Sequence, residues 1–131
     1  MVRCGHVYFL WLAAASKEKL VVPAFIEEDG RVRFFVINTN RTDFQIAKQE
    51  VTRHVLPLAM KANSKFLTRD CWLTCHEVVG GWYAADMEKN VGSYRGPLDG
   101  DAIAAVRVVI KDSRLYSEAE KAVILAQWPG T

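Results

Sequence analysis

Six polar side chains in the first 70 residues are of the types that phosphodiester cleavage without a metal requires. Such a reaction needs a base for the 2′-hydroxyl proton, cations for the charge that grows on phosphorus, and an acid for the leaving oxygen. The sequence contains no phosphate-binding glycine loop, G-x-S-x-G turn or two-histidine metal motif. The candidates for catalysis and for RNA binding are, respectively, Arg69, Asp70 and His54, and Arg41, Arg53 and Lys65.

These candidates lie in the basic part of the chain. From Arg31 to Arg69 there are eight Lys or Arg residues against only Asp43 and Glu50, although the whole chain carries a net charge of +2. Cations that share one face can bind a polyanion. The alternative is a set of solvated strand edges and loops, where lysine also discourages edge pairing.

The three cysteines favour neither a disulfide framework nor a metal site. Cys4 is remote in sequence from Cys71 and Cys75, and His76 has no second closely spaced Cys or His pair to complete a structural zinc site. Cys71 and Cys75 are expected to be small buried residues on one strand face. We therefore expect a reducing, cytoplasmic compartment, with no metal and no other cofactor.

Composition predicts one globular domain over residues 1–131. Half of the residues are apolar and 24% are charged, which is typical of a folded chain of this size. The longest apolar run, Val7 to Ala15, is too short to cross a bilayer, and no cleavage site follows it. No membrane association is expected.

Short runs of β-forming residues predict five strands in the first two thirds of the chain. Asp29-Gly30 predicts a tight hairpin turn, and Pro23 predicts an edge or a bulge. Gly80-Gly81 is expected to end the strand pattern. The expected strands cover residues 7–12, 20–26, 31–39, 51–58 and 66–75.

The last third of the chain changes to a helical period. A helix is expected from Asp99 or Asp101, although Val106 to Ile110 also suits a strand. Ser117 and Glu120 form a capping box that predicts a helix from Glu118 to Gln127. The predicted fold is mainly β with C-terminal α: a small antiparallel barrel (about 5–80) with one or two packed helices (about 99–128).

The order of several short motifs resembles the PemK/MazF-like growth-inhibitor family. The motifs are Gly5-His6-Val7-Tyr8-Phe9-Leu10, Lys19-Leu20-Val21-Val22, Phe34-Phe35-Val36-Ile37-Asn38-Thr39, and Phe66 to Cys75. The resemblance, to a divergent branch of that family, implies an SH3-like barrel of about five strands. It also implies a homodimeric bacterial, plasmid or phage toxin that cuts single-stranded RNA without metal and is neutralised by an antitoxin.

Two departures from the family pattern keep a second function open. The family places an Arg and an Asp one residue apart on a strand, whereas Arg69 and Asp70 are adjacent and would point to opposite faces. The family's Arg-Pro pair is also absent, with Val22-Pro23 near its position. The alternative is a non-catalytic interaction module on the same barrel, plasmid- or phage-encoded, that acts through a protein partner.

Overall fold

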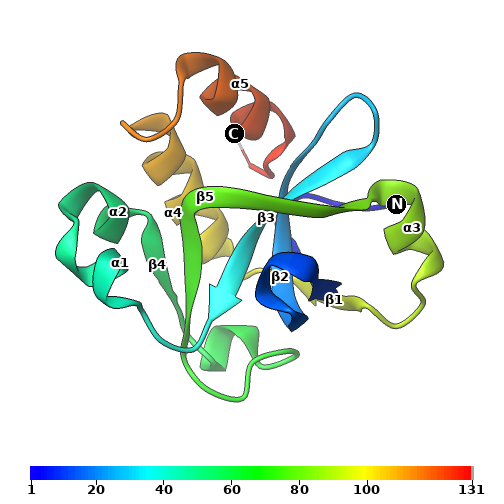
Figure 1. Ribbon diagram of the computed structural model, residues 1–131. Coiled ribbons are helices and arrows are strands. Elements are labelled where there is room, and N and C mark those ends of the chain that lie inside the picture. Colours follow the sequence, from blue (N-terminus) through cyan, green and yellow to red (C-terminus); the bar gives the residue numbers. More distant parts are fainter. Residues whose placement is uncertain (131) are drawn as a thin grey trace.

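The computed structural model describes residues 1–130, and its centre is a six-stranded antiparallel sheet in the order β4-β5-β3-β2-β1-β6 (Figure 1). This confirms the predicted fold class, mainly β with C-terminal α, and adds to it a sixth strand and several short helices between the strands. The strands are β1 (His6–Leu12), β2 (Lys17–Ile26), β3 (Arg31–Asn38), β4 (Val55–Leu58), β5 (Cys71–Tyr83) and β6 (Tyr94–Pro97).

The β2–β3 hairpin forms where its turn sequence predicts. Gly30 has a φ of +90°, a left-handed conformation that favours glycine. The Asp29 carboxylate accepts hydrogen bonds from the Arg31 amide and from its guanidinium. The register of β2 against β3 shifts between Pro23 and Phe25, which confirms the expected bulge at the proline.

The strand predicted over residues 66–75 is wrong in position. β5 begins at Cys71, so the residues from Phe66 to Asp70 form a loop and do not share strand faces. The strand also runs through the glycine pair. A Cβ on Gly80 would lie 2.7 Å from Nη1 of Arg33, and Gly81 has a φ of +121°. The glycines thus let a side chain from β3 cross β5 closely rather than end the strand.

The strand predicted over residues 51–58 is half helix. Two short helices, α1 (Asp43–Ala47) and α2 (Gln49–Arg53), precede β4. Thr42 and Gln45 form a capping box at the start of α1. Three further short helices are η1 (Ala13–Ala15) and η2 (Lys61–Asn63), both of the 3-10 type, and α3 (Ala84–Lys89).

Two helices form the C-terminal part, α4 (Gly100–Lys111) and α5 (Glu118–Gln127). Asp99 caps α4, which excludes the alternative strand over 106–110, and the Ser117 capping box begins α5 as predicted. The stripe of Ala119, Val123 and Ala126 on α5 faces solvent, and Ile124 is the residue of this helix that is buried. No helix within residues 1–130 is long and apolar enough to cross a membrane.

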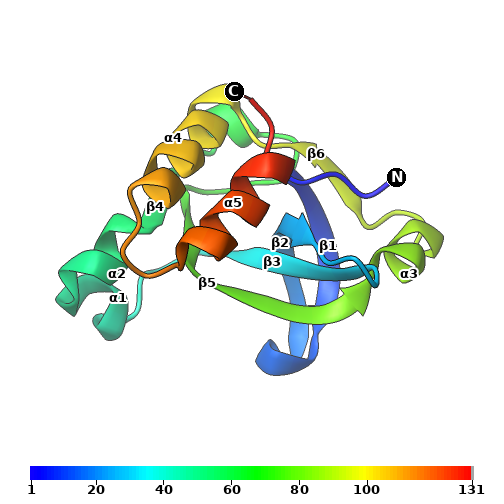
Figure 2. The same ribbon diagram turned by 90° about the horizontal axis from the view of Figure 1, so that it is seen from above.

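The sheet has apolar residues on both faces, as its two-faced strand sequences require. One core cluster joins the sheet to α4 and α5, which lie together over one side of it (Figure 2); its fully buried members include Phe35, Leu73 and Ile110. A second cluster on the other face includes Leu10, Phe34 and Met87. Residues of these clusters lie next to the site described below: Ile37 and Leu73 of the first cluster, and Val21 of the second.

The sheet closes through side chains rather than through a strand ladder. Its edge strands, β4 and β6, are followed by Asn63 and Asp99, respectively, and these two residues bond reciprocally. The Asn63 amide donates to Asp99 Oδ1 at 2.8 Å, and the Asp99 backbone amide donates to Asn63 Oδ1 at 3.1 Å. These two hydrogen bonds therefore link the segments after β4 and β6, the two edge strands of the sheet.

Candidate functional site

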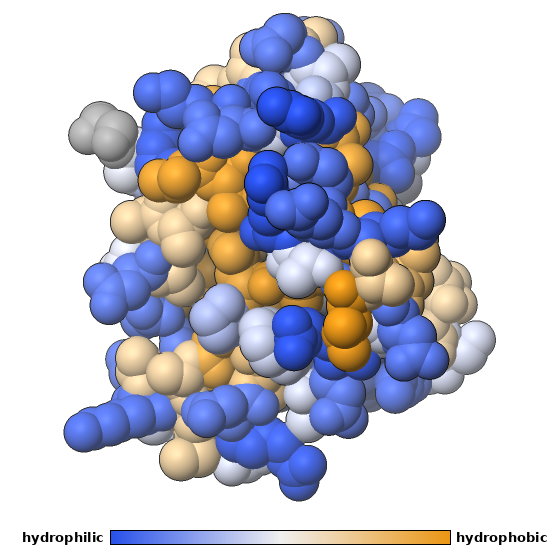
Figure 3. Space-filling model, turned by 90° about the vertical axis from the view of Figure 1, so that its left-hand side faces the viewer, coloured by the Kyte–Doolittle hydropathy of each residue, from blue (hydrophilic) through white to orange (hydrophobic). Residues whose placement is uncertain are grey.

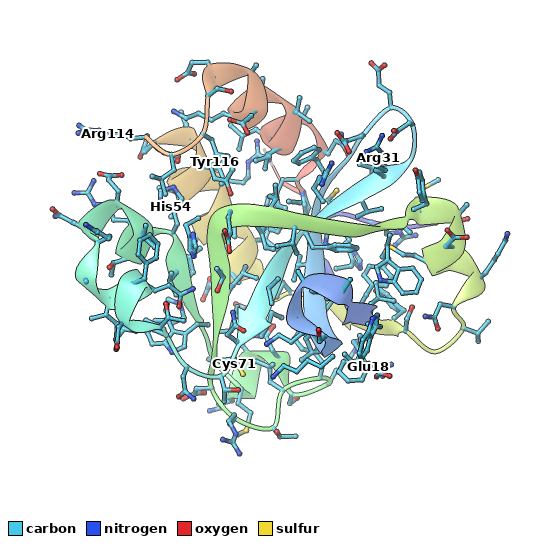
Figure 4. All side chains as sticks on the ribbon, in the orientation of Figure 1. Glu18, Arg31, His54, Cys71, Arg114 and Tyr116 are labelled. Atoms are coloured by element: carbon cyan, nitrogen blue, oxygen red, sulfur yellow. The ribbon has the colours of Figure 1, made fainter. Side chains whose placement is uncertain are left out.

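The three residues predicted for catalysis do not meet in the structure. His54 lies beside Tyr116 at the bend of β5, next to Cys75, whereas Asp70 immediately precedes Cys71 at the start of this strand (Figure 4). The His54 side chain is only 1% exposed. Its Nδ1 donates to the Glu50 carbonyl at 2.7 Å, and its Nε2 accepts from the Ser113 hydroxyl at 2.6 Å.

His54 belongs to a structural cluster. The Ser113 oxygen also accepts from the Leu115 amide, and the Tyr116 hydroxyl donates to the Cys75 carbonyl at 2.7 Å. Burial lowers the pKa of His54, so the neutral ring fits this arrangement. With both ring nitrogens bonded and no open surface, His54 joins the C-terminal helices to the sheet and cannot reach a substrate.

Arg69 and Asp70 are both exposed, in the loop before β5. Asp70 Oδ1 accepts from the Met60 amide at 2.9 Å, so this carboxylate closes the loop on itself. Arg69 makes no ion pair with any of residues 1–130. It lies close enough to the Cys71 thiol to oppose the rise in the pKa of that thiol caused by burial.

The RNA-binding candidates are also separated. Arg53 is paired with Glu50 at 3.0 Å. Lys65 lies beside β6, where its Cδ is 3.7 Å from the place a Cβ on Gly96 would take. Arg41 stacks over the ring of Trp72, with its guanidinium carbon 4.3 Å from the ring centroid. Of the three, only Arg41 combines a cation with an aromatic surface.

The predicted basic segment does not form one surface. Arg31 is paired with Asp29 at 2.8 Å and Arg33 with Glu27 at 3.1 Å, both at the β2–β3 hairpin. Figures 1 and 4 place this hairpin, with Arg31 labelled, at the opposite end of the sheet from Cys71. The cations that remain near the start of β5 are therefore the ones relevant to a polyanion.

A polar network crosses the sheet at that end. The Lys19 ammonium donates to Asn38 Oδ1 at 2.7 Å, and Asn38 Nδ2 donates to Thr74 Oγ1 at 3.1 Å. Gln45 Nε2 lies 3.4 Å from the same hydroxyl oxygen and 3.3 Å from Nε2 of His76. We call these five residues, Lys19, Asn38, Thr74, Gln45 and His76, the Lys19–His76 network.

Strand register and helix capping position this network. Thr74 on β5 lies opposite Val36 on β3, two residues before Asn38. Between Val36 and Phe34 on β3, β5 advances from Thr74 to Val79, so the ladder is bulged here and β5 bends. The Gln45 side chain is fixed because its Oε1 accepts from the Thr42 amide in the capping box. Its NH₂ group must then point toward the sheet.

Four members of the Lys19–His76 network, Lys19, Asn38, Thr74 and Gln45, form the floor of a cleft of about 260 Å³, and His76 lies behind Gln45, outside the lining. η1 and α1 stand on its two sides, and the Glu77 carboxylate lines it together with Lys19 and Asn38. Burial, followed by the charge of Lys17, lowers the pKa of Lys19. The cleft thus presents an ammonium, a carboxylate and fixed amide groups to whatever enters it.

Aromatic side chains stand beside this cleft. Trp72 carries Arg41 on its face, and Phe44, which is 55% exposed, makes an edge contact with His76 at 6.2 Å between ring centroids. Figure 3, which views the molecule from the side of α1 and α2, shows apolar side chains in the middle of this face with polar ones above them. Stacking surfaces therefore border the polar floor.

Sequence reasoning missed most of this site because its residues come from four elements with no common motif. The one local signal was Thr42 followed three residues later by Gln45, a spacing that fits a capping box. It would have predicted the start of α1 and the position of the Gln45 side chain. No group of three His, Cys, Asp or Glu residues within residues 1–130 is arranged to hold a metal ion. In comparisons with known proteins, no family model and no curated protein matches this sequence.

Proposed function

We propose that this protein binds single-stranded RNA at the strand end around Trp72 and cleaves it in the cleft above the Lys19–His76 network. The observation that carries the proposal is the network itself, in which an ammonium, two amides, a hydroxyl and an imidazole are bonded in sequence beside an exposed carboxylate. Such fixed polar groups bind a charged ligand without having to reorganise.

Binding rests on charge and stacking. Arg41 on Trp72 offers a guanidinium for a phosphate, and the exposed ring of Phe44 offers a face on which a base can stack. Lys17 and Lys19 are near neighbours on β2, and Arg69 adds a cation close to Cys71. Single strands suit this surface because their bases are free to stack on protein aromatic rings.

Cleavage uses the groups of the cleft. The Glu77 carboxylate takes the proton of the 2′-hydroxyl, the 2′ oxygen bonds to phosphorus, and the bond from phosphorus to the 5′ oxygen breaks. The Lys19 ammonium stabilises the charge on the non-bridging oxygens. His76 lies outside the lining of the cleft and its Nε2 accepts from the Gln45 amide, so a water molecule in the open cleft gives a proton to the departing 5′ oxygen. The products are a 2′,3′-cyclic phosphate and a 5′-hydroxyl.

These roles replace most of the residues expected from the sequence. The buried His54 has no counterpart in the cleft, and Glu77 takes the place of Asp70, which closes a loop. Arg69 stays in the proposal as a phosphate contact. The Arg and Asp one residue apart, as in the PemK/MazF-like pattern, have no counterpart in the cleft.

The test is cleavage of labelled single-stranded RNA oligonucleotides by the purified protein in the presence of EDTA. We expect Glu77→Gln and Lys19→Gln to slow cleavage by about 10²-fold or more, with the fold unchanged because neither side chain is in the core. Glu28→Gln and Lys89→Gln, exposed residues outside the cleft, are the matched controls. Equal rates for the cleft variants and their controls would contradict the proposal.

The ion pairs of Arg31, Arg33 and Arg53 favour a second candidate function, an interaction module that acts through a protein partner. With these three neutralised, fewer cations remain for RNA than the sequence offers. The same purified protein separates the two functions. An absence of both binding and cleavage at low salt would exclude the nuclease and leave the interaction module.

A further inference from the structure

A pocket of about 520 Å³ lies away from the cleft. The N-terminal segment, α3 and the turn before β6 line it, and it is open to solvent. Figures 1 and 2 both place α3 and the N-terminus at the end of the molecule remote from α1 and α2. A volume of this size suits a small organic ligand.

The cavity has a rigid apolar wall. Val2, Tyr8 and Met87 line it, and each is at most 6% exposed because each also belongs to the second core cluster. Tyr94 completes the wall, and its ring meets the Tyr8 ring edge-on at 5.3 Å between centroids. The two ring planes are inclined by 61°, so they form a corner in which a planar group can pack against one ring and meet the other edge-on.

Polar groups converge on the same space with hydrogens to donate. Ser93 is 5% exposed and its backbone is held by hydrogen bonds to Phe9 and Asn90. Its hydroxyl bonds to no side chain or backbone group of residues 1–130, and since no buried side-chain oxygen is left unpaired, this oxygen is open to the pocket that Ser93 lines. The Tyr8 oxygen accepts from the Arg3 amide at 3.2 Å, but no described residue accepts the Tyr8 hydrogen. Both hydroxyls therefore have a hydrogen available for a ligand.

The charge near the cavity favours an anion. Arg3 lines the cavity, and its charge lies close enough to Tyr8 to oppose the rise in the pKa of that phenol caused by burial. Arg3 forms no ion pair within residues 1–130, whereas Glu88, the acidic group of the lining, faces the N-terminal amine at 3.9 Å. His6, just outside, is occupied by a 2.7 Å hydrogen bond to the Tyr94 hydroxyl. Arg3 is thus the cation with no competing carboxylate bonded to it.

We propose that this cavity binds a small organic anion with a flat apolar body, an aromatic carboxylate being the simplest case. The ring packs against Tyr94 and Met87. The carboxylate accepts from the Arg3 guanidinium and from the hydroxyls of Ser93 and Tyr8. This site is independent of the RNA cleft, since the two share no lining residue.

The experiment is a titration of the isotope-labelled full chain with benzoate, followed by amide chemical shifts in NMR. We expect shifts confined to residues 1–8 and 87–94 at about 10 mM benzoate, a concentration suited to a weak fragment. Benzamide, which has the same shape without the charge, should bind about tenfold more weakly. Arg3→Gln should abolish that preference, and Ser93→Ala should weaken benzoate binding.

Lys89→Gln, on α3 but outside the lining, is the control and should bind benzoate as the natural sequence does. Shifts scattered over the surface, or equal binding of benzoate and benzamide, would overturn the anion site. The failure of this proposal is distinguishable from that of the nuclease, because Arg3→Gln leaves every residue of the RNA cleft in place.

Discussion

One hydroxyl group holds the polar floor of the cleft together. Thr74 Oγ1 receives hydrogen bonds from amides on β3 and on α1, and its side chain is only 5% exposed. A buried donor that loses its acceptor carries a larger penalty than the bond's own net contribution. Thr74 therefore fixes both Asn38, which holds Lys19, and Gln45, which holds His76.

Thr74→Val should destabilise the protein by about 1–3 kcal/mol, because the valine keeps the shape but leaves two amide donors without an acceptor. Urea unfolding at constant slope measures this change. Thr68→Val, at an exposed loop position, is the matched control and should shift stability by no more than about 0.5 kcal/mol. An equal, small effect of both substitutions would show that the network does not hold the cleft.

His54 should make folding sensitive to acid. Burial lowers its pKa in the folded state from the ordinary 6.5, so below pH 6.5 the unfolded chain takes up the proton first. Stability is therefore complete above pH 6.5 and falls as the pH drops below it, by about 1.4 kcal/mol for each unit by which the pKa is lowered.

The measurement is urea unfolding of the natural sequence, His54→Gln and His6→Gln at pH 7.5 and 5.5. Burial lowers the pKa of His6 as well, with a further effect of Arg3, so the His6 variant reports the other histidine that contributes with the same sign. His54→Gln should be less stable at pH 7.5 and lose less on acidification. An unchanged acid loss in that variant would remove His54 from this role.

At the scale of elements, turn and helix-capping signals were reliable, whereas strand-like alternation and features that depend on distant residues were not. The Asp29-Gly30 turn and the Ser117 capping box depend on neighbouring residues and were predicted correctly. The start of β5 was wrong because Phe66 to Asp70 alternates like a strand but packs as a loop around Asp70 and Met60. The prediction that Gly80 ends the strand was wrong because the role of this glycine is to make room for Arg33, which lies on another strand.

The Asp99 side chain caps α4 and also bonds to Asn63. Removing it should therefore lower the free energy of unfolding by more than removing an ordinary helix cap does. Its Oδ2 accepts from the Ala102 amide at the start of α4, while its Oδ1 accepts from Asn63, which is 3% exposed. Asp99→Ala should lower the unfolding free energy by about 2–4 kcal/mol, the sum of a cap and a stranded buried amide. Ser117→Ala, which removes a cap alone, should lower it by about 1 kcal/mol.

Thermal and urea unfolding of the two variants provide the comparison. Asn63→Ala adds a third measurement, because in a double-mutant cycle its effect should couple to that of Asp99→Ala. Additive effects of the two substitutions would mean that the side-chain closure between the sheet edges contributes nothing.

At the scale of the whole molecule, the charge pattern of the sequence divides into two parts. The cations at the hairpin and on α2 are paired with nearby carboxylates, whereas Lys19, Arg41 and Arg69, near the start of β5, form no ion pair with any of residues 1–130. The linear sequence could not show this division, because pairing depends on which residues the fold brings within reach. This difference in pairing is the reason that the proposed RNA site includes Arg41 and Arg69 but not Arg53.

RNA affinity should therefore depend on salt through a small set of cations. For single strands the logarithm of the binding constant falls by about 0.7 per phosphate contact for each decade of salt, so four contacts give a slope of about −3. The four are Lys17, Lys19, Arg41 and Arg69.

Lys19→Gln and Arg41→Gln should each make the slope shallower by about 0.7. Arg53→Gln, whose guanidinium is already paired with Glu50 at 3.0 Å, should leave the slope unchanged. Fluorescence anisotropy of a labelled RNA over a salt series measures all four proteins. A slope that responds to Arg53 as strongly as to Arg41 would place the RNA on the outer face of α2 and away from the cleft.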